Sequence, residues 1–182
     1  MLTNAGYQYR AVSADIDERE IETAHLSSGL PADELALVLA NAKARTVSAK
    51  YPVDLVIGSD QVLLCQGTVF SKVKDLNEAA KQLSALQGKT HQLISAAACW
   101  KGNKPLFQAK EQADMSMYRL TAEEIETYLA DTGSTILGSV GCYQIEGKGI
   151  RLFENINGSH FTIMGMPLIR LVRFLRQQNC LQ

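Results

Sequence analysis

Two long strand-like segments, residues 91–100 and 106–118, constrain the fold more than any other feature of the sequence. The turn-forming residues 102–105 join them, and a connection this short pairs its two strands antiparallel. Both segments are longer than an average strand, which is typical of a large sheet. We therefore expect a large mixed sheet at the centre of the fold.

Helices are predicted between the strands, which makes the chain an α/β protein. A helix from about Pro31 has acidic residues in its first turn and an apolar stripe that comprises Leu35, Val38, Leu39 and Ala42. Further helices are predicted to begin near Asp75, Thr121 and Pro167. With 182 residues, 46% of them hydrophobic and 20% charged, the chain is expected to form one domain over residues 1–182.

Charge and cysteine usage exclude several classes of partner. The net charge is −1 and the 18 basic residues are scattered, so a nucleic-acid polymer is not expected as a partner. The four cysteines are far apart and form no Cys-x-x-Cys pair, which argues against a zinc site or a disulfide framework and favours the cytoplasm. No segment approaches the roughly 20 apolar residues that span a bilayer, and the N-terminus lacks a signal-peptide pattern, so no membrane partner is expected.

The first part of the chain is predicted to contain the end of a helix and a strand. Residues 1–5 have the pattern of a last helical turn, Gly6 suits the position after it, and residues 7–12 alternate like a strand. Because this pattern starts abruptly, we expect that a segment precedes Met1 in the complete protein.

A hairpin is predicted around the two-residue loop of Gln66 and Gly67. Counting outward from this loop places Lys72 opposite Gln61, beside Asp60. A regular ribbon would put Asp60 and Lys72 on opposite faces, so their direct contact requires a bulge or a strong twist.

Asp60 is the first candidate for chemistry. It follows the buried strand-like residues 55–57 through Gly58 and Ser59, and open α/β sheets present catalytic groups where their strands end. The alternative is that Asp60 only caps a turn. The local pattern leaves both interpretations open.

Three charged residues are candidates to act with Asp60. Hydrolysis of a phosphoanhydride requires a carboxylate that binds a divalent ion or orients water, and lysines that neutralise phosphate oxygens. Lys43 and Lys72 would be these lysines, and Glu18 would supply a second oxygen ligand. Each has a plainer alternative: Lys43 as a solvated helix residue, Lys72 as a strand-edge residue, and Glu18 as part of a solvated acidic loop.

Other catalytic motifs do not fit the sequence. The glycines of residues 138–149 match neither a Walker loop nor a dinucleotide fingerprint. His25, His91 and His160 lie too far apart in sequence for a recognisable metal motif, and no Gly-x-Ser-x-Gly elbow occurs. With these motifs excluded, phosphate chemistry assisted by a hard metal ion remains compatible with the sequence.

Six short motifs, taken in order, resemble those of the Maf-like proteins over essentially the whole chain. They are Asp-Ile-Asp-Glu at 15–18, Leu-Ala-Asn-Ala-Lys-Ala at 39–44, Ile-Gly-Ser-Asp-Gln at 57–61, Gly-Lys-Thr-His at 88–91, Gly-Cys-Tyr-Gln-Ile-Glu-Gly-Lys-Gly at 141–149 and Gly-Met-Pro-Leu at 165–168. The resemblance implies a fold like that of the inosine triphosphatases, an elongated mixed sheet with flanking helices and a central cleft. It also implies a homodimer that uses Mg²⁺ or Mn²⁺ to cleave nucleoside triphosphates to monophosphate and pyrophosphate.

The resemblance also assigns roles to individual residues. By position, Asp60 matches the family's catalytic carboxylate and Glu18 an acid that binds metal or orients water, and the implied metal ion is held by Asp60 and Glu18. Lys43 and Lys72 match the family's phosphate-binding lysines. These are the residues that the chemistry of phosphoanhydride hydrolysis had already singled out.

Two further positions bear on the substrate. Gln61, where many members have Thr, and Glu146, where many have Gln, are similar to the subgroup that acts on 7-methyl-GTP rather than on dTTP and UTP. The chain departs from the family pattern at Val73, where Pro is usual, and at Ser159 and Thr162, where Asp and Asn are common. The family's N-terminal strand and its Ser-x-Ser-x-x-Arg loop, which grips the triphosphate, are expected just before Met1.

Two functions of different classes follow. The first is a metal-dependent nucleoside triphosphate pyrophosphatase. The second is a catalytically impaired protein of the same fold that binds nucleotides or takes part in septum formation, because the triphosphate-gripping loop is not in the sequence. A translation start upstream of Met1 would restore the loop and favour the enzyme.

Overall fold

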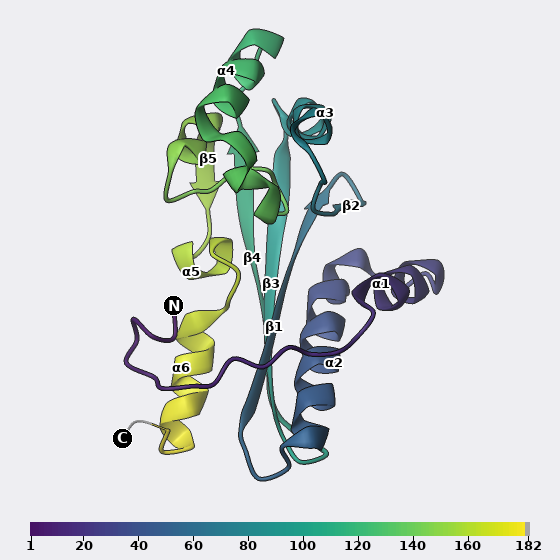
Figure 1. Ribbon diagram of the computed structural model, residues 1–182, viewed down its shortest axis with the longest axis vertical. Coiled ribbons are helices and arrows are strands. Elements are labelled where there is room, and N and C mark those ends of the chain that lie inside the picture. The colour runs from purple at the N-terminus through teal and green to yellow at the C-terminus, as the bar shows by residue number, and fades with distance from the viewer. Residues whose placement is uncertain (181–182) are drawn as a thin grey trace. The chain divides into compact units, whose positions relative to one another are not determined.

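The computed structural model describes residues 1–180, which form helices and a five-stranded sheet with the strand order β2-β1-β3-β4-β5 (Figure 1). With 3-10 helices written as η, the elements in chain order are α1 Glu18–Ser27, η1 Ala32–Glu34, α2 Leu35–Lys50, β1 Val56–Cys65, β2 Thr68–Phe70, α3 Leu76–Leu86, β3 Thr90–Lys101, β4 Lys104–Met117, α4 Ala122–Thr132, η2 Gly133–Gly138, η3 Lys148–Leu152, β5 Phe153–Asn157, α5 His160–Ile163 and α6 Leu168–Gln177. This combination of sheet and helices confirms the predicted α/β class. No helix within residues 1–180 is both long enough and apolar enough to cross a bilayer.

The described chain divides into two compact units. The first consists of residues 1–61 and 94–111 and of the described residues from Ser159 onward. The second consists of residues 62–93 and 112–158. Strands β1, β3 and β4 each contribute residues to both units. The expected single domain remains a prediction.

Helix α6 covers one face of the strands in the first unit. It begins after Pro167, as predicted, and buries Leu171, Phe174 and Leu175 at helical spacing. These side chains pack on strand residues that share one face of the sheet, namely Ile57, Ala97, Cys99 and Phe107, and on Leu55 just before β1. Full burial of a side chain such as Leu171 stabilises the fold by about 2 kcal/mol, so this cluster is a substantial part of the unit's core.

Helix α2 lies on the other side of these strands from α6 (Figure 1). Small residues let helix and strand approach closely: a Cβ atom at Gly58 would lie 2.7 Å from the backbone nitrogen of Ala44 and would overlap the Ala40 carbonyl oxygen. The expected apolar stripe is partly wrong, because Val38 is 36% exposed whereas Ala40 and Ala44 are fully buried. The buried face of α2 follows the alanines because close packing on a glycine needs small side chains.

Strand β1 is longer than predicted and contains Asp60 in its interior. It runs without a break from Val56 to Cys65, so the prediction that Asp60 stands where a strand ends is wrong. Gly58 lies within the strand. Because glycine has no side chain, the backbone of α2 can approach the strand closely at this point.

The predicted hairpin after β1 is confirmed. Gln66 and Gly67 have φ angles of 50° and 80°, as a type I′ turn requires, and Cys65 pairs with Thr68. Strand β2 ends at Phe70. The register counted outward from the loop therefore stops before Lys72, which lies beyond the paired residues.

The second unit contains the capped helices that the sequence predicts. The side chain of Asp75 accepts a hydrogen bond of 2.8 Å from the Glu78 N–H at the start of α3. Thr121 and Glu124 form a complete capping box at the start of α4. Gly88 follows α3 with a φ of 66°, in keeping with its predicted position after the helix. Strand β5 pairs antiparallel with the end of β4.

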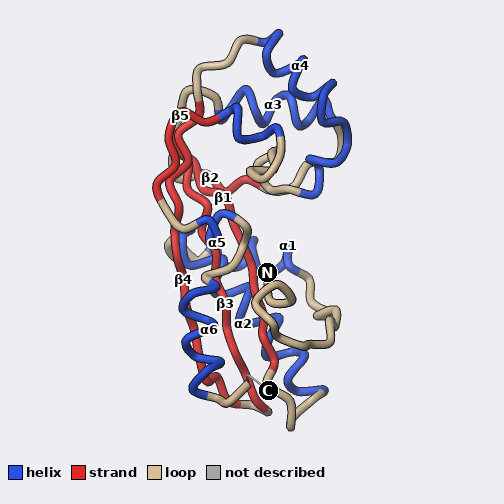
Figure 2. Tube along the Cα trace, turned by 90° about the vertical axis from the view of Figure 1, so that its left-hand side faces the viewer, coloured by secondary structure: helices blue, strands red, loops and turns tan. Residues whose placement is uncertain are grey.

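The N-terminal segment forms a helical turn but no strand. The Ala5 N–H donates to the Met1 carbonyl at 3.0 Å and Gly6 has a φ of 85°, which confirms the predicted turn. Residues 7–17 form a loop, tan in Figure 2, so the predicted strand over residues 7–12 is wrong. Tyr7 is buried but residues 8–13 are all exposed, so the alternation of the sequence has no buried face that would hold a strand.

Candidate functional site

Lys43 brings two carboxylates together in the first unit. Its ammonium nitrogen lies 2.6 Å from Asp60 Oδ1 and 2.8 Å from Glu18 Oε1. The side chain of Asp60 is 11% exposed, that of Lys43 21% and that of Glu18 55%, so the cluster extends from the sheet to the surface. Three site residues that the sequence predicted from separate motifs therefore meet.

The close packing of α2 on β1 places Lys43 over Asp60. Asp60 and Gly58 lie on the same face of β1, because side chains alternate along a strand. The backbone at Gly58 meets α2 at Ala40 and Ala44. Lys43 lies between these alanines along the helix, one turn after Ala40, so its side chain reaches the carboxylate two residues along the strand from Gly58.

The start of helix α1 supplies Glu18. The acidic run is not a solvated loop throughout, because α1 begins at Glu18 and the Asp17 side chain accepts a 2.9 Å hydrogen bond from the Glu20 N–H. The spacing of Asp17 and Glu20 is that of an N-terminal cap, a signal that sequence reasoning missed. A fixed helix start holds Glu18 in the first turn, where a carboxylate is also favoured by the helix dipole.

The two carboxylates share a single ammonium group. Burial by itself lowers the pKa of Lys43, but the hydrogen bonds from Lys43 to Asp60 and Glu18 outweigh burial and raise its pKa above the ordinary value of 10.5. Lys43 therefore stays protonated at neutral pH. The two carboxylates thus bind one cationic group, the Lys43 ammonium, in common.

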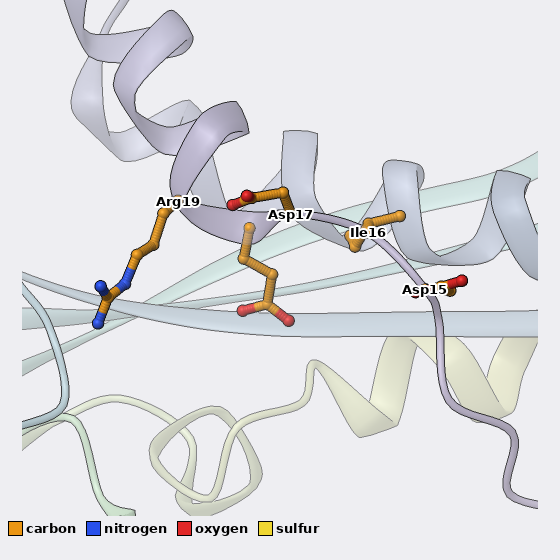
Figure 3. Close-up of a pocket in the computed structure, with 5 residues that line it drawn as sticks. Asp15, Ile16, Asp17 and Arg19 are labelled. Atoms are coloured by element: carbon orange, nitrogen blue, oxygen red, sulfur yellow. The ribbon is translucent and has the colours of Figure 1, made fainter.

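An open pocket borders this cluster. It is lined by the consecutive residues 15–19 (Figure 3). Figure 3 shows this segment entering helix α1, with Asp15 at one end and Arg19 extending away from it at the other. Glu18 lines the pocket and also contacts Lys43, so a ligand in the pocket would reach the ion cluster through Glu18.

Glu18 and Asp60 fit part of a magnesium-type site. Mg²⁺ takes hard oxygen ligands and is commonly held by one or two protein carboxylates together with substrate phosphates and water. Both carboxylates already face one cationic centre, the Lys43 ammonium, so their oxygens can converge on the same cation. Within residues 1–180, no group of three His, Cys, Asp or Glu side chains is arranged to hold a metal ion. Phosphate oxygens and water commonly complete a site of this type.

Gln61 points to the other face of β1 from its neighbour Asp60, as alternation along a strand requires. Its amide nitrogen donates to Ser95 Oγ at 3.0 Å, to the Thr162 carbonyl at 2.9 Å and to the Ile163 carbonyl at 3.0 Å. These acceptors occupy both N–H groups of the amide. The predicted part of Gln61 in substrate specificity stays a prediction.

Lys72 and Glu146 belong to the second unit, and both are exposed. Glu146 lies three residues after Tyr143, which is anchored in the same unit: its hydroxyl lies 2.7 Å from Nε2 of the buried His91. The Tyr143 ring also packs on Gly141, where a Cβ atom would overlap the ring. The phosphate-binding role of Lys72 and the specificity role of Glu146 remain predictions.

Sequence reasoning missed two buried polar residues beside Gln61. Ser95 and Thr162 are fully buried, and the Thr162 hydroxyl donates a 2.8 Å hydrogen bond to Glu111 Oε2. Ser95 lies in a run of small residues that predicts only close packing. Thr162 was noted as a departure from the family pattern and not as a site residue. No local pattern marks residues whose partners are so distant in the sequence.

Comparison with known proteins places the chain among nucleotide-cleaving enzymes. A family model described as Maf-like protein matches residues 1–178. The chain is 41% identical over 181 residues to the nucleoside triphosphate pyrophosphatase of Granulibacter bethesdensis, covering 100% of this chain and 92% of that protein. It is 44% identical over 181 residues to the 7-methyl-GTP pyrophosphatase of Brucella abortus, covering 100% and 91%. It is 47% identical over 176 residues to the 7-methyl-GTP pyrophosphatase of Mesorhizobium japonicum, covering 97% and 88%.

Proposed function

Because the chain belongs to the Maf-like protein family, we propose that it is a divalent-metal-dependent nucleoside triphosphate pyrophosphatase that releases monophosphate and pyrophosphate. The family resemblance and the expected enzyme class, a hydrolase of phosphoanhydride bonds, are confirmed by the family match and the names of the relatives. The observation that carries the proposal is the convergence of Glu18 and Asp60 on the Lys43 ammonium.

The chemistry that we assign to these side chains follows from their charge and burial. Asp60, which is largely buried, accepts the proton of the attacking water and orients that water towards the α-phosphorus. Lys43 offers a permanent positive charge to the phosphate oxygens, on which negative charge develops in the transition state. Lys72 is the second lysine in this role. A Mg²⁺ or Mn²⁺ ion held by Glu18 and Asp60 would supply further neutralisation of the polyphosphate.

We propose 7-methyl-GTP as the substrate, with Gln61 and Glu146 as the residues that select it. Relatives with similar identity carry both the general name and the 7-methyl-GTP name, so the names alone do not choose between substrates. The 7-methylguanine base carries a positive charge. An exposed carboxylate such as Glu146 attracts that base more than it attracts a neutral pyrimidine.

Pyrophosphate release from 7-methyl-GTP, GTP, dTTP and UTP, with Mg²⁺ or Mn²⁺ and with a chelator, tests the proposal. Asp60→Asn is expected to lower kcat by about 100-fold or more, because it removes the proton acceptor. Asp54→Asn is the matched control: this carboxylate belongs to the same unit and pairs with Arg10 at the surface, 3.6 Å away. The control is expected to keep the activity of the wild type.

Three results would contradict the proposed function: no cleavage of any triphosphate, an unaffected Asp60→Asn variant, or full activity in the presence of the chelator. Nucleotide binding in calorimetry without any turnover would support the alternative, a catalytically impaired nucleotide-binding protein. We also propose the homodimer that the family resemblance implies. Light scattering of the purified protein checks it, and the mass of a single chain would contradict it.

A further inference from the structure

The two residues that flank Asp60 both fasten β1 to the segment around helix α5. The Ser59 hydroxyl is placed to donate to the Ala96 carbonyl at 2.9 Å and to the Gly165 carbonyl at 3.0 Å. Gly165 has a φ of 104°, a conformation that favours glycine, and it forms the turn between α5 and α6. The contact of Ser59 with this turn therefore depends on a backbone shape that other residues rarely adopt.

On the other side of Asp60, Gln61 binds the carbonyl groups at the end of α5. The last carbonyls of a helix have no partner within the helix and accept hydrogen bonds from elsewhere; that of Thr162 accepts one of 3.0 Å from the Gly165 N–H. Gln61 donates to those of Thr162 and Ile163. Ser95 Oγ also donates to the Thr162 carbonyl, at 2.6 Å, which links strand β3 to the same point.

Segment 159–165 is itself fixed to strand β4. The hydroxyl of Thr162, a fully buried residue, donates to Glu111 Oε2 at 2.8 Å. A hydrogen bond to a carboxylate is stronger than one between neutral groups. Helix α5 is therefore bound to β4 through the Thr162 side chain, and to β1 and β3 through the carbonyl groups of Thr162 and Ile163. All these residues belong to the first unit.

We propose that segment 159–165 is a latch that positions Asp60 for catalysis, and that Ser59, Gln61 and Thr162 are positioning residues. This inference rests on the proposed function and deepens it. The latch grips β1 immediately before and after Asp60 but on the face opposite to the Asp60 side chain. It acts through the backbone, fixing the direction in which the carboxylate leaves the strand.

Two variants of Thr162 separate positioning from simple packing. Thr162→Val keeps the shape of the side chain but removes the hydroxyl that binds Glu111, whereas Thr162→Ser keeps the hydroxyl. For Thr162→Val we expect kcat to fall about 10-fold with KM little changed, because a small misplacement of a reacting group costs rate rather than binding. Thr162→Ser should restore most of kcat. Thr132→Val is the matched control, since the Thr132 hydroxyl bonds the Tyr128 carbonyl of its own helix.

Hydrogen exchange of the backbone amides of residues 59–61 gives a readout that does not depend on turnover. The latch predicts faster exchange there in Thr162→Val, with unchanged exchange in helix α4. Wild-type exchange at residues 59–61, or an equal increase throughout the chain, would overturn the latch, as would wild-type kcat in an active protein. If the wild-type protein cleaves no triphosphate, the proposed function fails while the exchange experiment still tests the latch.

Discussion

His91 makes the stability of the fold depend on pH. Its side chain is fully buried in the second unit, and Nε2 lies 2.7 Å from the Tyr143 hydroxyl. The other ring nitrogen, Nδ1, has no hydrogen-bond partner within the described residues. Burial lowers the pKa of His91 from its ordinary value of 6.5 to about 4. The folded protein therefore keeps this imidazole neutral at a pH where the unfolded chain would protonate it.

The sign and size of the effect follow from this difference. Between the two pKa values the unfolded chain binds more protons than the folded protein, so stability falls as the pH falls. The contribution of His91 to the free energy of unfolding is complete above its pKa of 6.5 in the unfolded chain. It is lost as the pH falls towards its pKa of about 4 in the folded protein. One pKa unit corresponds to about 1.4 kcal/mol, so the full loss is about 3 kcal/mol. About 2 kcal/mol of it is lost between about pH 7 and about pH 5.

Urea unfolding at several pH values, compared with the variant His91→Gln, measures this loss. Glutamine keeps a polar group but does not titrate, so the wild type should lose about 2 kcal/mol more than the variant between about pH 7 and about pH 5. Tyr143→Phe is the control for the hydrogen bond: it should lower stability at every pH but keep the pH slope, because burial is the cause of the low pKa. Equal slopes for the wild type and His91→Gln would refute the argument.

Two further variants test the geometry of the site. Gly58→Ala places a Cβ atom against the backbone of α2 at Ala40, so we expect a loss of about 2 kcal/mol in urea unfolding and a lower kcat; Gly138→Ala, which has open space around it, should be close to wild type, and equal stability of the two variants would contradict the close packing. Asp17→Ala removes the cap of α1 and should raise the Mg²⁺ concentration needed for half-maximal activity, because Glu18 loses its fixed position. Asp17→Asn keeps a capping group and should behave like the wild type, and an unchanged Mg²⁺ requirement in Asp17→Ala would contradict the role of the cap.

Local signals in the sequence predicted the elements whose stability is local. The caps at Asp75 and Thr121 and the turn at Gln66 and Gly67 depend on hydrogen bonds and φ angles within a few residues, and all are present. The end of β1 was mispredicted because Gly58 has the local appearance of a breaker. Its real function is a contact with a helix more than ten residues earlier in the chain, which no local pattern contains.

The candidate site shows the same division. Motif order and phosphate chemistry pointed to Asp60, Lys43 and Glu18, and the structure brings these three together. The sharing of one ammonium by two carboxylates could not be predicted, because it depends on how closely α2 packs on β1. Ser95 and Thr162 were missed for a related reason: a buried hydroxyl is stable only through partners supplied by tertiary structure.

Strand alternation gives the neighbouring residues Asp60 and Gln61 different tasks that are nevertheless connected. Asp60 faces Lys43, whereas the Gln61 amide donates hydrogen bonds to Ser95 and to carbonyls of segment 159–165. Threonine at this position would have a side chain too short and too poor in donors to make these contacts. An exchange of Gln61 for threonine would therefore loosen the backbone at Asp60 as well as alter any contact with the base. We expect turnover to fall in such a variant and, as the proposed specificity role of Gln61 predicts, substrate choice to change with it.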